Sequence, residues 1–147
     1  MTGDEAFRFI DDVTSDLTFE ARGATLGDVF AAASEALLAA AVERPEAVCD
    51  VVERRLALED TRLDWLLRRF LSELVYLLDA EHLALRARRV DVRGEEPDFH
   101  LDAVLVGETL DRERHVAAND VKAVTAYGLA VARDEHGDWR ARVTLDV

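Results

Sequence analysis

Apolar residues recur at helical spacing in a first segment that starts at Leu26. Thr25 and Asp28, three residues apart, form a T-x-x-D start pattern in which the threonine side chain caps the helix. Pro45 restricts the residue before it to extended backbone, so the helix should end by Arg44. The pattern therefore predicts an amphipathic helix over residues 25–44.

The same pattern appears a second time. Thr61 and Asp64 repeat the T-x-x-D spacing, and a stripe of leucines and one phenylalanine then continues to about Asp79. We expect a second amphipathic helix over residues 61–79, with its apolar stripe against the core.

The remaining segments alternate apolar and polar residues, which is typical of half-buried strands. We expect these strands over residues 17–22, 48–59, 83–93, 99–107, 121–133 and 139–147. Gly137 favours a hairpin before the last one, because glycine readily adopts positive φ. Two helices with strands massed after the second predict an α+β fold: a two-layer sandwich in which both helices cover one face of a mixed β-sheet of about six strands. The 147 residues suit one domain, 1–147.

Charge and composition narrow the class of protein. The chain carries 31 acidic and 18 basic residues, a net charge of −13, and nothing larger than the short Arg86 to Arg89 run forms a basic patch, so stable direct nucleic-acid binding is disfavoured. The single Cys49 cannot form an internal disulfide and disfavours a zinc site. No uncharged apolar run approaches the roughly 18 residues of a membrane span, and the N-terminus lacks a secretory pattern, so we expect a cytoplasmic location.

Two charged residues stand out by position. Glu73 lies on the apolar stripe of the second helix, so it either meets a cation, a metal or hydrogen-bond donors, or lies at the rim of that stripe, where it could pair with an arginine. Lys122 is the only lysine beside seventeen arginines. A compact ammonium differs from a planar guanidinium in how it meets carboxylates and phosphates, so Lys122 is either a functional cation or an ordinary surface residue.

Acidic residues gather where the chain enters and leaves the predicted sheet. Asp11, Asp12 and Asp16 precede the first strand, and Asp146 precedes the terminal carboxylate of Val147. If the first and last strands are neighbours, Asp16, Asp146 and Val147 form an oxygen-rich pocket suited to Ca²⁺, Mg²⁺ or Mn²⁺. The alternative is a solvated acidic surface. The chain lacks the common nucleophile, P-loop, dinucleotide and zinc-protease motifs.

The whole chain resembles the archease family. The matching pieces are "FIDDVTSD", "ARGATLGDVFAAASEALL", "WLLRRFLSELVYLLD", "GETLDRERH", "VKAVTAYGL" and the ending L-D-V, in order from about residue 7 to 147. The resemblance implies the α+β fold expected above. It also implies a protein cofactor, not an enzyme, that promotes guanylylation and multiple turnover of an RtcB-type RNA ligase, which uses GTP and a divalent metal in tRNA splicing and RNA repair.

The resemblance further implies a metal site at Asp16, Asp146 and Val147, and it places Glu73 and Lys122 on the family's active surface. This sequence departs from the family at the histidine of the opening motif, where Asp12 or Val13 stands instead. Asp11 is then either a replacement ligand or solvated. Two alternatives to ligase activation are a stand-alone metal-dependent phosphohydrolase using the same carboxylates and a chaperone-like interaction module.

Overall fold

The two predicted helices begin in different ways in the computed structural model, which describes residues 5–10 and 16–147. Helix α1 (Leu26–Ala41) is capped as predicted, because the Thr25 hydroxyl accepts the backbone N–H of Asp28 at 3.1 Å. The capping prediction at Thr61 is wrong. Helix α2 (Leu63–Glu81) starts after Arg62 without a side-chain cap, and the Arg62 guanidinium pairs with Asp64 at 2.7 Å instead.

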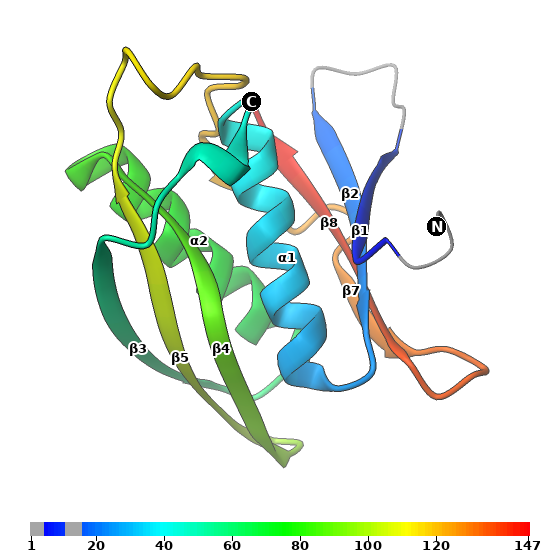
Figure 1. Ribbon diagram of the computed structural model, residues 1–147. Coiled ribbons are helices and arrows are strands. Elements are labelled where there is room, and N and C mark those ends of the chain that lie inside the picture. Colours follow the sequence, from blue (N-terminus) through cyan, green and yellow to red (C-terminus); the bar gives the residue numbers. More distant parts are fainter. Residues whose placement is uncertain (1–4, 11–15) are drawn as a thin grey trace.

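Eight strands form two antiparallel sheets in the described part of the chain (Figure 1). One sheet has five strands, with β1, β2, β8 and β6 in that order and β7 also paired with β8. The other sheet has three strands in the order β3, β5, β4. The strand bounds are β1 Phe7–Ile10, β2 Leu17–Gly23, β3 Val52–Asp60, β4 Leu83–Glu95, β5 Asp98–Thr109, β6 Ala123–Val124, β7 Ala130–Arg133 and β8 Trp139–Asp146.

Both helices lie between the two sheets (Figure 1). Helix α1 packs on β4 of one sheet and on β2 of the other, and α2 packs on β3 and β4 as well as on β6. The α+β class is confirmed. The layers differ from the predicted single mixed sheet with helices on one face, because each sheet has an apolar face to bury and the helices present apolar residues to both.

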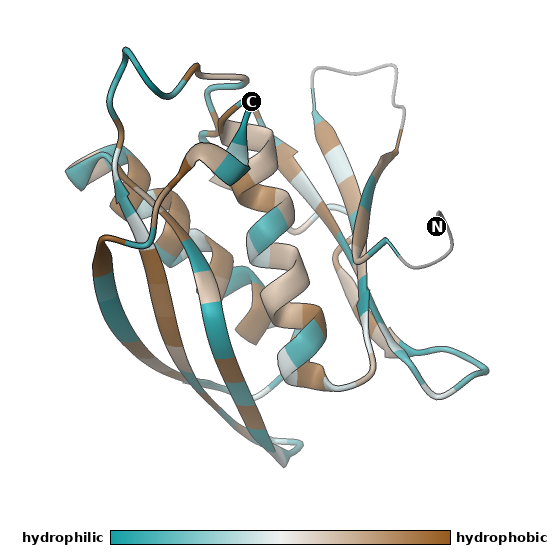
Figure 2. Cartoon of the chain, in the orientation of Figure 1, coloured by the Kyte–Doolittle hydropathy of each residue, from teal (hydrophilic) through white to brown (hydrophobic). Residues whose placement is uncertain are grey.

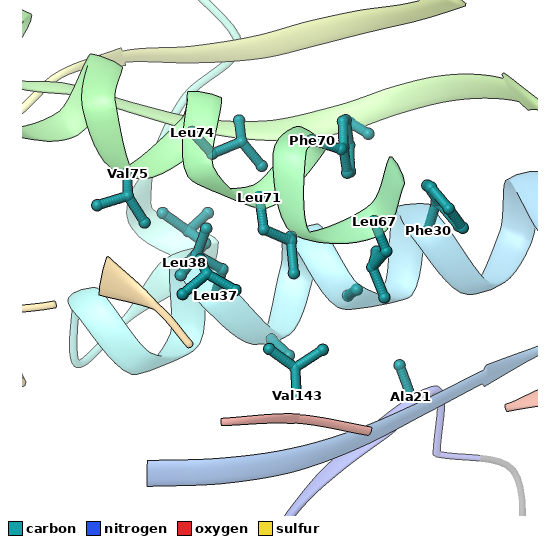
Figure 3. Close-up of a cluster of buried hydrophobic side chains, with 14 of the residues drawn as sticks. Ala21, Phe30, Leu37, Leu38, Leu67, Phe70, Leu71, Leu74, Val75 and Val143 are labelled. Carbon is teal, nitrogen blue, oxygen red and sulfur yellow. The ribbon is translucent and has the colours of Figure 1, made fainter. Parts of the chain in front are cut away.

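The core between the layers is almost entirely aliphatic and aromatic (Figure 3). Phe30 of α1 and Phe70 of α2 are fully buried, with ring centroids 5.9 Å apart. Ala21 of β2 and Val143 of β8 reach the same cluster from the five-stranded sheet. Figure 2 shows the complementary pattern, with hydrophobic residues along the middle of β5 and hydrophilic ones at the tip of the β7–β8 hairpin.

The observed strands differ from the predicted ones in several places. The strand predicted from Val48 begins only at Val52, because a short 3-10 helix (Pro45–Ala47) precedes it. The single strand predicted over 121–133 divides into β6 and β7 around Gly128, whose φ is +64°. Strand β1 was not predicted, because four residues give too short an alternating pattern. No helix among the described residues is long and apolar enough to cross a membrane.

A β-bulge in β4 is joined to α1 by one buried hydroxyl. The register of β4 on β5 shifts between Ala87 and Arg89. Ser34, fully buried on α1, accepts the backbone N–H of Ala87 at 2.9 Å and donates to the carbonyl of Ala31 at 2.7 Å. The serine thus satisfies a backbone donor beside the bulge and fixes α1 against the three-stranded sheet.

We predict that Ser34→Ala lowers the free energy of unfolding by about 1–3 kcal/mol, because it leaves the buried N–H of Ala87 without an acceptor. Chemical denaturation measures this. The matched control is Ser72→Ala, which removes a half-buried hydroxyl from α2 and should change stability by no more than about 0.5 kcal/mol. Equal stability of the two variants would show that the Ser34 hydrogen bond contributes little.

Candidate functional site

Strands β2 and β8 are neighbours. This is the condition under which the acidic residues at the two ends of the sequence are expected to form one pocket. They pair antiparallel from Gly23 with Trp139 to Leu17 with Leu145. Asp16 comes immediately before Leu17, and Asp146 comes immediately after Leu145. Continuing the register places these two aspartates opposite one another, at the end of the ladder.

The two aspartates also share a face of the sheet. Leu145 is fully buried on the core side, so the alternation of side chains places Asp146 on the opposite face, with Thr144. Thr18 is paired with Thr144 on that face, their hydroxyls being 2.9 Å apart, and alternation places Asp16 there too. Both aspartates are partly exposed. The sheet therefore brings two carboxylates to one face and one end.

Lys122 reaches the same end from the other side of β8. Ala123 of β6 pairs with Asp146, and the backbone N–H of Lys122 donates to the carbonyl of Asp146 at 2.8 Å. The next position in this register sets Lys122 opposite Val147. The Lys122 side chain is exposed. The backbone of the chain's only lysine thus lies beside Asp146, whereas alternation places its side chain on the Leu145 face of the sheet, toward α2, and not on the face of the two aspartates.

Glu73 lies on helix α2 and not at the end of β8. It is partly exposed on α2, in a hollow that it lines with Leu58 and Asp60 of β3 among others, and no ion pair involves it in the described part of the chain. Lys122 lines a second hollow, with Tyr76 and Asp79 of α2 among its other walls. Because Glu73 is partly exposed, the structure supports the interpretation that it lies at the rim of the apolar stripe of α2.

Arg68 and Ser72 separate Glu73 from Lys122, because these two residues line both hollows. Asp11 and Asp12, the other two predicted candidates, lie outside the described residues.

The donor set at the end of β8 suits a hard cation. No group of three or more His, Cys, Asp and Glu side chains able to hold a metal occurs among the described residues. Two aspartates on neighbouring strands, with the carboxylate of Val147, would supply oxygen ligands only, and water would complete the shell of Ca²⁺, Mg²⁺ or Mn²⁺. Tetrahedral zinc, which prefers sulfur and imidazole nitrogen, fits this set poorly.

A second charged cluster, which the sequence analysis did not identify, lies where β5 ends. The side chain of Glu108 is 10% exposed and meets three donors. It accepts the backbone N–H of Cys49 at 2.5 Å, pairs with the guanidinium of Arg114, and lies 3.3 Å from Nε2 of His115. We call Glu108, Arg114 and His115 the Glu108 cluster. Its trace in the sequence is the Glu, Arg and His of "GETLDRERH".

The His115 ring in this cluster has one definite tautomer. Its side chain is fully buried, and Nδ1 accepts the backbone N–H of Asp111 at 2.8 Å. An acceptor nitrogen carries no proton, so the remaining proton lies on Nε2, which faces Glu108. The Nε2–H therefore faces the Glu108 carboxylate at 3.3 Å, while Nδ1 holds the turn that begins at Asp111.

The pKa of Glu108 is lowered below its ordinary value. The hydrogen bond from the Cys49 backbone is the largest cause, and burial opposes it, while Arg114 and the neighbouring His115 lower the pKa further. The carboxylate is therefore ionised in the folded protein at neutral pH. It stabilises the contact between the segment that contains Cys49 and the segment that contains Arg114.

We predict a pH signature for Glu108→Gln. The folded pKa lies below the ordinary value of 4.5, so the ionised group stabilises the fold above pH 4.5, and this contribution disappears as the pH falls through the lowered value. The wild type should therefore denature at higher denaturant concentration than Glu108→Gln at pH 7, with the difference shrinking below pH 4.5. Glu135→Gln, at the exposed hairpin tip, should match the wild type throughout. A constant difference for Glu108→Gln would contradict the assignment.

Known proteins match almost the whole chain. The family model described as Archease protein family (MTH1598/TM1083) matches residues 7–147. The protein archease of Methanosarcina acetivorans is 33% identical over 135 residues, 91% of each chain.

Two solved structures share the fold. The solution structure of Methanobacterium thermoautotrophicum protein 1598 has a TM-score of 0.83 at 31% identity and covers 97% of this chain and 99% of its own. The crystal structure of an archease, possible chaperone, from Thermotoga maritima has a TM-score of 0.64 at 17% identity, covering 95% of this chain and 97% of its own. A family match over nearly the whole chain, together with relatives above 30% identity, shows that this chain belongs to the Archease protein family.

Proposed function

We propose that this protein activates an RtcB-type RNA ligase in tRNA splicing or RNA repair, promoting ligase guanylylation and multiple turnover. Membership of the Archease family supports the proposal. The observation that carries it is the pairing of β2 with β8, which brings Asp16 and Asp146 to adjoining positions at one end of the sheet. The protein acts in this proposal as a cofactor of the ligase and has no catalytic activity of its own.

In the proposed mechanism, Asp16, Asp146 and the Val147 carboxylate hold a divalent cation. When bound, such a cation would offset negative charge on a transferring phosphoryl group. Lys122, whose backbone is hydrogen-bonded to Asp146, offers an exposed ammonium to a phosphate or carboxylate of the partner. Glu73 contributes to the active surface from α2, and Asp11 and Asp12 stay candidates beside Asp16.

Charge suits this partner. A protein with a net charge of −13 and carboxylates gathered at one end is attracted to the basic cleft in which a ligase binds RNA and nucleotide. The same charge opposes direct contact with RNA phosphates, so the protein should reach RNA only through the ligase.

A chaperone-like interaction module is the second candidate. The Thermotoga maritima relative is described as a possible chaperone. Four aromatic side chains are exposed among the described residues: Phe9, Trp65, Tyr76 and Tyr127, at 40%, 50%, 60% and 76%. Such side chains could contact unfolded protein. This function requires no cation, so suppression of aggregation that persists with excess chelator would favour it.

A stand-alone metal-dependent phosphohydrolase is the third candidate, and it uses the same carboxylates. None of the described histidines is available as a base beside them, because His115 is buried in the Glu108 cluster and the others flank carboxylates on the surface or end α2. Phosphatase or nuclease activity of the isolated protein would favour it.

We predict that Asp16→Asn and Asp146→Asn each weaken cation binding at least about tenfold, the lower end of the loss seen when a supporting group is removed from a metal site. Calorimetric titration with Ca²⁺, Mg²⁺ and Mn²⁺ measures the affinity. With the cognate ligase and GTP, the same variants should stimulate ligase guanylylation far less than the wild type over many turnovers.

Glu135→Gln is the matched control, because it removes one exposed carboxylate from the β7–β8 hairpin tip. It should bind and stimulate as the wild type does. Failure of the wild type to stimulate its ligase would refute the proposed function. Full stimulation by both aspartate variants would refute the metal-dependent mechanism.

A further inference from the structure

The segment between β5 and β6 connects the Glu108 cluster to the end of β8. Figure 1 shows it passing, in yellow and gold, from β5 across the end of the molecule where the C-terminus lies. Its first part is held at Glu108, and its last residue, Lys122, is hydrogen-bonded to Asp146. We propose that Glu108, with Arg114 and His115, is a positioning residue that sets the location of Lys122 beside the candidate carboxylate site.

The Glu108 cluster determines how the beginning of this segment folds. Asp111 to His115 form a tight turn, in which the backbone N–H of His115 donates to the carbonyl of Asp111 at 2.7 Å and the N–H of Asp111 donates to the His115 ring at 2.8 Å. The ring's other nitrogen faces Glu108. Glu108 therefore fixes the direction in which the chain leaves this turn.

The middle of the segment is then bonded to the C-terminal end of α1. The carbonyl of Val116 accepts the backbone N–H of Glu43 at 2.9 Å, and the backbone N–H of Ala118 donates to Ala41 at 2.9 Å. The Asn119 side chain donates to the carbonyl of Ala40, also at 2.9 Å. The bonds from Ala118 and Asn119 satisfy carbonyls in the last turn of α1, and all three continue the connection toward Lys122.

The same carboxylate also holds the other segment at this end. The backbone N–H of Cys49 donates to Glu108 at 2.5 Å, and Cys49 follows the 3-10 helix that leaves α1. Both chain segments that meet the end of α1 thus take their position from one side chain. An apolar residue could fill the space, but directional bonds to a charged acceptor select one arrangement.

The position of Lys122 needs such a support because its own side chain has none. No ion pair or side-chain hydrogen bond of Lys122 occurs in the described residues, and the ammonium is exposed on a flexible four-carbon stem. The backbone of Lys122 is held by the pairing of β6 with β8 on one side and by the segment anchored at Glu108 and Asn119 on the other.

The first test uses the fact that Lys122 is the only lysine. Reductive methylation with ¹³C-formaldehyde gives one dimethyl-lysine NMR signal, with the α-amino signal as an internal reference. Glu108→Gln should shift or broaden the Lys122 signal at a temperature where the variant stays folded. Asp102→Asn, which removes a surface carboxylate paired with Arg93 on the same strand, should leave it unchanged. An unchanged signal in Glu108→Gln would overturn the inference.

Asn119→Ala provides a variant that should not unfold the protein, because Asn119 is exposed and contributes one hydrogen bond to Ala40. It breaks the connection nearest to Lys122. We expect it to move the same NMR signal even if Glu108→Gln destabilises the fold. A signal that moves in neither variant would show that Lys122 is placed independently of the segment.

The second test rests on the proposed function, since it measures ligase stimulation in a double-mutant cycle of Glu108→Gln and Lys122→Met. If Glu108 acts through Lys122, the double variant should stimulate about as well as Lys122→Met alone, a ratio near 1. Multiplied losses would mean that Glu108 acts independently and would overturn the inference. A wild type without stimulation would refute the proposed function, while the NMR test would still decide the positioning of Lys122.

Discussion

The pairing of β2 with β8 is the contact on which the rest of the structure depends. These strands lie near opposite ends of the sequence, yet seven consecutive residue pairs join them in the middle of the five-stranded sheet. Strand β1 adds to one side, and β6 and β7 add to the other. The apolar faces of β2 and β8 cover α1, and their polar faces carry the two aspartates. One register therefore determines both the core and the candidate site, because slipping it by a single residue would turn every side chain to the wrong face.

Charge is distributed unevenly around this frame. Most described ion pairs are exposed, such as Arg88 with Glu53 and Arg93 with Asp102 on the three-stranded sheet, and each contributes little to stability. The Glu108 cluster differs because its carboxylate and imidazole are buried, and no buried side-chain nitrogen or oxygen among the described residues lacks a hydrogen-bond partner. Removing one partner there leaves an unsatisfied group, so the arrangement is specific in a way that the surface pairs are not.

Much of this architecture could be predicted from local patterns, and the failures have physical causes. The helix capped by Thr25 and the alternation of β2 and β8 follow from short-range rules that tertiary contacts do not override. Thr61 matches the same capping pattern but does not cap α2, because Asp60 accepts the Thr61 N–H and Asp64 pairs with Arg62. The arrangement of two sheets around the helices is a property of packing, which alternation in single strands cannot reveal.

The candidate site could likewise be predicted from the sequence only in part. Asp16 and Asp146 could be identified as a possible pair, since both lie at strand ends, but whether they meet depends on a strand order that the sequence leaves open. The Glu108 cluster was missed although its residues stand in one short stretch. Its significance comes from the backbone of Cys49, some sixty positions earlier, which donates to Glu108.

The β2–β8 contact also affects how the protein folds during synthesis. Contacts between residues so far apart in sequence carry an entropic cost of loop closure and slow folding. During synthesis, β2 cannot find its central partner until residues 139–146 have left the ribosome, so a chain truncated before them would expose the apolar faces of β2 and α1. The two aspartates therefore come together at one end of the sheet only in a chain that has been made and folded through Asp146.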